Sequence, residues 1–123
     1  MVNDFNIAVG DVNASVNILR EVAQWCEDNN MGMWKVSDLT KESLLHELTE
    51  ENFCVGRIGR DSACSMILQW NDPLFWPEAK ENEAGYIHKL CVRRKYSGMG
   101  LSGEMINFAV AECKRRDIRY LRL

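Results

Sequence analysis

The sequence predicts an α+β protein (a mixed α/β class) with a mostly antiparallel sheet, helices on both faces and one parallel crossover. Two observations lead to this class. Apolar residues alternate with polar ones in several short segments, as in half-buried strands, and recur every three or four positions in longer ones, as in amphipathic helices. The order of the segments places a hairpin in the middle of the chain and a strand, a helix and a strand at its end.

The chain begins with a predicted strand and a long helix. Apolar residues alternate over positions 5–9, which predicts a strand that stops at Gly10. Asp11 follows as a helix-capping residue, and the helix ends at 29–32, where Asn-Asn-Met-Gly breaks the pattern. The apolar positions of this helix are Val12, Val16, Leu19, Val22, Ala23 and Cys26.

A second helix and a hairpin are predicted next. The helix follows positions 37–38, with leucines on one face and glutamates largely on the other, and we expect it to lie across the sheet. Residues 53–70 have the pattern of two strands around a turn at 59–62. Two prolines and a polar remainder without a period predict a loop over 71–85. The leucines of the helix are Leu44, Leu45 and Leu48.

The end of the chain is predicted to form a parallel crossover. Residues 86–92 are a strand, 93–97 a connector, and a helix opens at Gly98 or Gly100 and runs to about position 116. Its core-facing residues are Leu101, Met105, Phe108, Ala109 and Cys113. Residues 118–123 complete the unit as a fifth strand, which lies parallel to the fourth because the connection is right-handed.

Length and charge restrict the function. At 123 residues we expect one domain, 1–123. The net charge of −3 and the pI near 5.4 argue against a nucleic-acid partner. The charge is uneven, because residues 88–123 hold nine Lys and Arg against three acids, a local +6, and the rest carries −9. This split favours an anionic ligand on the basic segment and a cationic substrate on the acidic one.

Targeting and metal signals are weak in the sequence. No apolar run approaches the roughly 18 residues of a membrane span, and the first residues lack the basic and apolar regions of a leader peptide. We therefore expect a cytoplasmic protein without a membrane partner. The cysteines lie in apolar stretches without metal-binding spacing, which predicts buried thiols and no metal site. They are Cys26, Cys54, Cys64, Cys91 and Cys113.

A glycine-rich turn, Ser97-Gly98-Met99-Gly100-Leu101-Ser102, precedes the last predicted helix. Glycine allows close approach of a ligand to the backbone, and the start of a helix presents unsatisfied N–H groups and a partial positive charge. These properties predict a phosphate site, with a plain helix start as the alternative. The string also satisfies G-x-G-x-x-G, but its distance from the strand and the lack of a ribose-binding acid disfavour a dinucleotide fold. The absence of Gly-Lys-Ser/Thr excludes a nucleoside-triphosphate loop.

The run YIHKLCVRRKYSGMGLSGEMINFAVAECKRRDIRYLRL resembles the GNAT N-acetyltransferase superfamily over its whole length. Leu90-Cys91-Val92 occupies the place of the family's Leu-x-Val strand end, and Tyr96 that of its connector aromatic. The turn occupies the place of Gln/Arg-x-x-Gly-x-Gly/Ala; Ser97 and Ser102 depart from that motif, and Gly100 keeps it. The resemblance implies an acyl-CoA N-acyltransferase-like fold.

The resemblance also implies a function. Acetyl-CoA would be the cosubstrate, and its acetyl group would pass to a primary amine of a small molecule or peptide by direct attack in a ternary complex.

The family continues with a further helix and two strands, so the domain would be C-terminally short. Its last strand would be an exposed edge, which favours a homodimer. A non-catalytic, acetyl-CoA-binding module stays open as the alternative. The implied cofactor-binding residues are Leu90, Cys91 and Val92 for pantetheine and Ser97, Gly98, Met99, Gly100, Leu101 and Ser102 for pyrophosphate.

A base must take a proton from the amine before attack, because amines are mostly protonated at neutral pH. His88 is the first candidate, since imidazole titrates near neutrality and strand alternation puts it on the same face as Tyr86 and Leu90. A structural histidine is the alternative reading. Glu83 and Tyr86 are further catalytic candidates. Cys91 is rejected as a nucleophile, because no Cys-His arrangement surrounds it in the sequence.

Aromatic residues around the proline-rich loop are candidates for the wall of an acceptor pocket. They are Trp70, Phe75 and Trp76, and core packing is the alternative for them. Asp72 and Glu78 lie in the same stretch and would attract a cationic acceptor.

Overall fold

The computed structural model describes residues 4–123, and within them five strands form one sheet in the order β1-β2-β3-β4-β5. Neighbouring strands are antiparallel except for β4 and β5, which run parallel. The predicted α+β class and its mixed sheet are therefore confirmed. The elements are β1 (Phe5–Val9), α1 (Val12–Asp28), α2 (Lys41–Leu44), β2 (Phe53–Ile58), β3 (Asp61–Gln69), β4 (Ala84–Val92), α3 (Leu101–Arg115) and β5 (Tyr120–Arg122).

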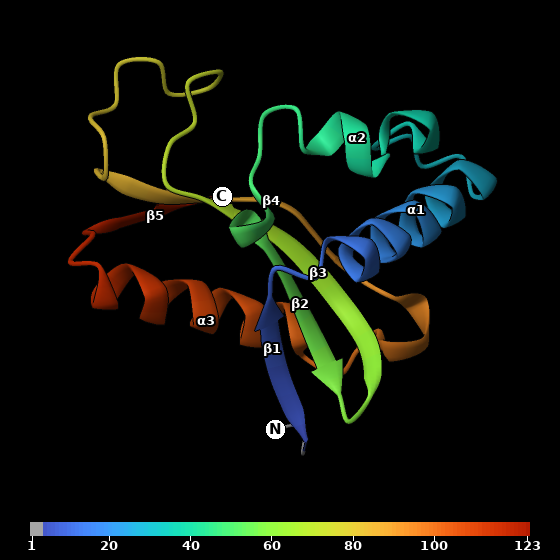
Figure 1. Cartoon of the computed structure of the whole chain (residues 1–123). Coiled ribbons are helices and arrows are strands. Elements are labelled where there is room, and N and C mark those ends of the chain that lie inside the picture. The colour runs from blue at the N-terminus through green and yellow to red at the C-terminus, as the bar shows by residue number, and fades with distance from the viewer. Residues whose placement is uncertain (1–3) are drawn as a thin grey trace.

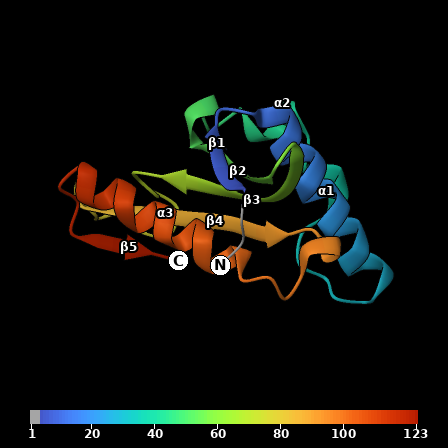
Figure 2. The ribbon, with the colours of Figure 1, turned by 90° about the horizontal axis from the view of Figure 1, so that it is seen from below.

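Helices cover both faces of the sheet, as predicted. Figures 1 and 2 show α3 on one face and α1 with α2 on the other. Each face has its own apolar core. The core under α3 contains Cys54, Ala63, Cys64, Met66, Leu68, Ile87, Leu101, Met105 and Ala109. The core under α1 contains Ile18, Leu19, Val22, Ala23, Cys26, Leu39, Val55 and Cys91.

Helix α1 begins and ends where the sequence predicts. The backbone N–H of Ala14 donates to the side chain of Asp11 at 3.1 Å, which is the predicted N-cap. At the other end, Asn30 has a positive φ of 57°, a conformation that asparagine tolerates and that stops the helix.

Helix α2 is a single turn, shorter than predicted. The side chain of Thr40 caps it by accepting from the N–H of Ser43 at 3.0 Å. A second capping pair, Thr49 with Asn52, then starts a separate 3-10 turn, and this local hydrogen bonding competes with a continuous helix. The three leucines nevertheless pack as predicted, against Phe53 and Ile67 on the α1 side of the sheet.

Several strand boundaries differ slightly from the prediction. The hairpin turn contains only residues 59–60, because Ile58 already pairs with Asp61. Strand β4 begins at Ala84, and β5 is only three residues long. β5 is the outer strand of the sheet next to β4, and the homodimer through this edge stays a prediction.

All five cysteines are buried and free, as predicted. Burial raises the pKa of Cys54 and of Cys91 to about 12, so neither thiol is a ready nucleophile at neutral pH.

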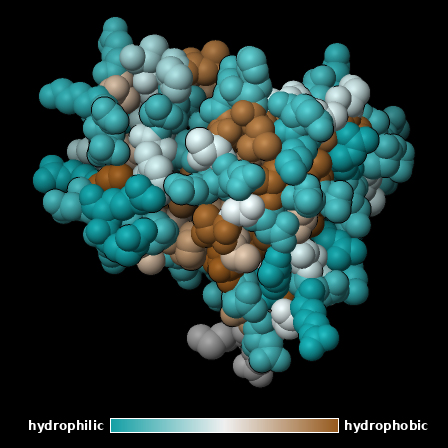
Figure 3. Space-filling view, in the orientation of Figure 1, coloured by the Kyte–Doolittle hydropathy of each residue, from teal (hydrophilic) through white to brown (hydrophobic). Residues whose placement is uncertain are grey.

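Within residues 4–123, no helix combines the length and apolar composition that crossing a membrane needs. Hydrophilic side chains cover most of the face shown in Figure 3, and hydrophobic ones are visible near its centre.

Candidate active site

Strand β4 carries a bulge next to His88. Ser65 pairs with Cys91 and Ile67 pairs with His88, so two steps along β3 correspond to three steps along β4. The extra residue introduces a local kink, and Lys89 has a positive φ of 52°.

The bulge changes which side chains share a face. His88 and Lys89, although consecutive, both line the same pocket on the α1 side of the sheet. Leu90 instead packs into the core under α3. The expectation that Leu90 shares a face with His88 is therefore wrong, because one extra residue inverts the alternation. Tyr86 precedes the bulge and contacts the loop beside His88, its ring 6.4 Å from that of Trp76.

Asp72, in the loop before β4, pairs with His88. Nε2 of His88 lies 2.9 Å from Oδ2 of Asp72, whose side chain is only 7% exposed. The other carboxylate oxygen accepts from the N–H of Phe75 at 3.4 Å, and the carbonyl of Asp72 accepts from the N–H of Trp76 at 2.8 Å. With an ionised carboxylate and a neutral imidazole, Nε2 donates to Asp72 and Nδ1 of His88 is the acceptor of the ring.

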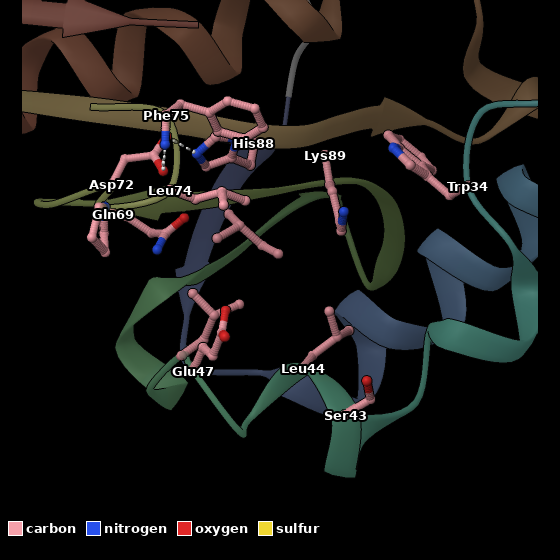
Figure 4. A pocket seen from close by; sticks show the side chains of 13 residues that line it. Trp34, Ser43, Leu44, Glu47, Gln69, Asp72, Leu74, Phe75, His88 and Lys89 are labelled. Atoms are coloured by element: carbon pink, nitrogen blue, oxygen red, sulfur yellow. Dashed lines mark hydrogen bonds and ion pairs between the residues drawn. The ribbon is translucent and has the colours of Figure 1, made fainter. Parts of the chain in front are cut away.

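The pocket beside this pair has a volume of about 480 Å³. Figure 4 shows Asp72, His88 and Phe75 gathered at one end, with the segment after α2 across from them. The wall combines apolar side chains with a few polar ones, which is typical of small-molecule sites. Its residues are Trp34, Ser43, Leu44, Glu47, Leu48, Ile67, Gln69, Asp72, Pro73, Leu74, Phe75, His88 and Lys89.

The two other catalytic candidates meet at Arg122 of β5. Nη1 of Arg122 lies 3.1 Å from Oε2 of Glu83 and donates to the hydroxyl of Tyr86 at 2.9 Å. The Arg122 guanidinium also stacks 3.9 Å above the ring of Trp76. Glu83 and Tyr86 thus tie the loop and β4 to β5, and neither lines the pocket that contains His88.

The glycine-rich turn has the backbone that a phosphate site requires. Gly98 and Gly100 have positive φ values of 81° and 77°, and apart from each glycine and its chain neighbours no protein atom lies within 4 Å of where a Cβ would stand on either. Gly100 is the N-cap of α3 and offers no side chain, so the N–H groups of the first helical turn stay available. Leu101 is only 1% exposed and packs with Leu90, which fixes the turn against β4.

The basic connector before the turn is largely engaged with protein groups. Arg93 pairs with Glu21 at 2.9 Å, and Lys95 pairs with Asp61 at 3.1 Å. The guanidinium of Arg94 stacks 4.2 Å from the Trp25 ring. The backbone N–H groups at the start of α3 are therefore the donors of this turn that no side-chain cap occupies.

Part of the β4 edge next to β5 is open. Residues of β5 pair with β4 only from Ala84 to Tyr86. Within the part of the chain that the structure describes, no β5 residue pairs with Leu90, Cys91 or Val92. This edge leads from the bulge to the glycine-rich turn, so an extended ligand has main-chain partners along it.

A sequence model described as the acetyltransferase (GNAT) family matches residues 19–123. The chain belongs to the GNAT acetyltransferase family. Over 108 residues this GNAT chain is 25% identical to the uncharacterized N-acetyltransferase YesJ of Bacillus subtilis strain 168. The match covers 80% of this chain and 58% of that relative, so the chain spans less than two thirds of its length.

Solved structures share the fold of this GNAT chain. A GNAT-family acetyltransferase from Listeria monocytogenes 4b F2365 aligns with a TM-score of 0.72 and 20% identity, over 95% of this chain and 74% of that one. An aminoglycoside acetyltransferase from an uncultured soil metagenomic sample, in complex with sisomicin, gives 0.67 and 15%, over 98% and 78%. A predicted acetyltransferase from Clostridium acetobutylicum, solved with acetyl-CoA, gives 0.61 and 13%, over 97% and 80%.

The aromatic candidates separate in the structure. Phe75 lines the pocket, whereas Trp76 lies beside it against Arg122. Trp70 packs into the core under α3, which agrees with the core-packing alternative for this residue. Glu78 lines a different hollow, with Trp76.

Sequence reasoning missed several pocket residues. Trp34 and Glu47 reach the pocket from segments far from β4, and only tertiary packing brings them there. Lys89 was missed because regular alternation places it on the opposite face from His88. Within residues 4–123, no three His, Cys, Asp or Glu side chains are grouped so as to hold a metal ion.

Proposed function

We propose that this chain transfers the acetyl group of acetyl-CoA to a primary amine held in the pocket beside His88. The observation that carries the proposal is the hydrogen bond between the buried Asp72 and the half-buried His88, which both line the pocket next to the β4 bulge. The structural relatives support it, since one was solved with acetyl-CoA and another with an amine-bearing aminoglycoside.

The proposed acetyl-CoA site follows the open edge of β4. The main chain at Leu90, Cys91 and Val92 would hold the pantetheine, and the turn from Ser97 to Ser102 would hold the pyrophosphate. The turn fits this role, because its glycines leave an open surface and the helix start carries uncapped N–H groups. Bound acetyl-CoA supplies the thioester that the amine attacks.

The proposed roles of the side chains follow from their hydrogen bonds. Asp72 holds the proton of His88 on Nε2, so Nδ1 takes the proton that the ammonium of the acceptor must lose. The neutral amine then forms a bond to the acetyl carbon while the carbon–sulfur bond breaks, and the second proton that the nitrogen loses passes to the sulfur, so coenzyme A leaves as a thiol. Glu83 and Tyr86 act through Arg122, which holds the loop that positions Asp72. Asp72 acts on the reaction through His88, so we propose it as a positioning residue.

Two measurements on the purified chain test the proposal. Acetyl-CoA at millimolar concentration is expected to raise the melting temperature, because a ligand that binds only the folded state stabilises it. Thiol release is then followed with a panel of primary amines. Stabilisation with amine-dependent thiol release supports the transferase. Stabilisation without thiol release for any amine contradicts it and favours the binding module, and no stabilisation contradicts both.

A matched pair of variants locates the acetyl-CoA site. Gly100→Val places a β-branched side chain at a positive φ in the turn, and Gly10→Val does the same at the start of α1. We expect Gly100→Val to abolish the stabilisation by acetyl-CoA and Gly10→Val to preserve it. Unchanged affinity in Gly100→Val would show that the turn is only a helix start.

A further inference from the structure

The charges on the pocket wall are not all neutralised by one another. Asp72 is satisfied by His88 and by the backbone of its own turn. Lys89 lies 5.5 Å from the centroid of the Trp34 ring, a contact that leaves its charge in place. Within residues 4–123, no carboxylate lies within ion-pairing distance of the Lys89 ammonium.

Lys89 reaches the pocket only because of the β4 bulge. Its φ of 52° is a conformation that residues other than glycine adopt at a cost. The surrounding sheet imposes this conformation and so places His88 and Lys89, two consecutive residues, on one wall. The imidazole of His88 and the positive charge of Lys89 therefore line the same pocket.

The pocket also separates its charges. In Figure 4, Asp72 and Glu47 lie toward one side, and Lys89 with Trp34 lies toward the other. The wall between them is apolar, since Leu74 and Phe75 of the loop face the pocket together with leucines of the α2 segment. A ligand that matches this wall has a positive group, a negative group and an apolar group.

We propose that the amine acceptor is a free amino acid with an apolar side chain, bound with its carboxylate on Lys89 and its amino group at His88. This inference rests on the proposed function. An α-amino acid carries an amine and a carboxylate on one small molecule, and His88 and Lys89, which would recognise them, line one pocket. An amine without a carboxylate leaves Lys89 unpaired, and the N-terminus of a peptide has an amide in place of the neighbouring carboxylate. The volume of about 480 Å³ suits a ligand of this size.

Three matched acceptors test the assignment. L-leucine, L-leucinamide and 3-methylbutylamine share the amine and the apolar group, and only leucine carries the carboxylate. With acetyl-CoA present, we expect kcat/KM for leucine to exceed that for either analogue by about tenfold or more, since a charged pair at this site gains about that factor. Equal values for the three, or a preference for 3-methylbutylamine, would overturn the assignment and leave acetyl transfer intact.

Charge variants then test the role of Lys89. Lys89→Gln is expected to lower the leucine to 3-methylbutylamine ratio of kcat/KM by about tenfold, through KM, and Lys89→Arg to retain most of it. Lys41→Gln makes the same charge change at an exposed residue of α2 outside the pocket wall and should keep the ratio. An unchanged ratio in Lys89→Gln would contradict the assignment.

Calorimetry distinguishes failure of this inference from failure of acetyl transfer. Leucine and leucinamide are titrated into the protein with and without coenzyme A. Binding of leucine but not of leucinamide supports the pocket even where no thiol is released. Absence of leucine binding in both titrations overturns the inference, whatever happens to acetyl-CoA.

Discussion

At the scale of single residues, the Asp72–His88 hydrogen bond offsets the burial of a carboxylate and holds an imidazole in place. A buried carboxylate without a partner loses its hydration, so Asp72 is tolerated at 7% exposure because His88 and the Phe75 N–H satisfy it. In return, the carboxylate fixes the orientation and tautomer of the imidazole. Because Asp72 lies 16 residues before His88, this hydrogen bond ties the loop to strand β4.

Substitution of the pair should affect turnover more than acceptor binding. His88→Gln removes the proposed base, and we expect kcat to fall by about 100-fold or more. Asp72→Asn keeps the shape but permits the other tautomer, so kcat should fall by about tenfold with little change in KM. Steady-state kinetics with acetyl-CoA measure both effects. His46→Gln alters the exposed histidine after α2 and serves as the control. Wild-type kcat in His88→Gln would rule out the assigned base.

The buried thiols predict how stability depends on pH. Burial raises the pKa of Cys54 and Cys91 to about 12 and of Cys64 to about 11, above the value of 9.0 for an exposed thiol. The unfolded chain therefore loses these protons first, so the stability present below about pH 9 is lost as the pH rises toward 12. Each thiol lowers the free energy of unfolding by about 1.4 kcal/mol per pH unit in this window.

Urea unfolding under reducing conditions between about pH 8 and about pH 10 measures this slope. Cys91→Ala removes one titrating group, and its slope should be shallower than that of the wild type by the contribution of one thiol. A slope that is the same in Cys91→Ala would contradict the link between burial and the pH dependence.

At the scale of elements, the sequence predicted the features that depend on neighbouring residues alone. The N-cap Asp11, the hairpin and the glycine start of α3 depend on residues near in sequence, and the structure confirms them. The bulge in β4 depends on how β3 and β4 align, and alternation in β4 alone carries no sign of it. The same limit concealed the partner of His88, because Asp72 comes from a loop without a periodic pattern.

Two glycines at the start of α3 should respond oppositely to alanine. Gly100 has a φ of 77°, so Gly100→Ala is expected to destabilise the protein by about 1 kcal/mol even though space is free around it. Gly103 lies inside the helix with no protein atom within 4 Å of a Cβ, so Gly103→Ala should stabilise by about 0.5–1 kcal/mol. Thermal and urea unfolding measure both variants. Effects of the same sign would contradict the assigned backbone conformations.

At the scale of the whole molecule, β4 separates the two proposed ligands. Its α1-side face carries His88 and Lys89 in the pocket, and its open edge leads to the turn at Gly100. Arg122 of β5 holds the loop of the pocket from the other side of β4. The two sites thus share one strand, and the bulge in that strand is where an amine from the pocket can approach a thioester on the edge.

We expect the local charge of +6 over residues 88–123 to contribute little, as a whole, to the electrostatic field at the glycine-rich turn. Lys114 lies near the far end of α3, roughly 20 Å from Leu101 along the helix, which is twice the Debye length of about 10 Å at 0.1 M salt. Arg93 and Lys95 are paired with acids, which leaves Arg94 as the one cation of the connector 93–97 without a carboxylate partner among the described residues.

Two equal charge changes should therefore differ in their effect on acetyl-CoA binding. Arg94→Gln is expected to raise the Kd about threefold to fivefold, because Arg94 belongs to the connector that leads into the turn, three residues before Ser97 in the sequence. Lys114→Gln should leave the Kd unchanged within error at about 0.1 M salt, since screening removes its field before the turn. Calorimetric titration measures both, and equal losses of affinity would show that the field of the whole basic segment, rather than the groups at the turn, holds the pyrophosphate.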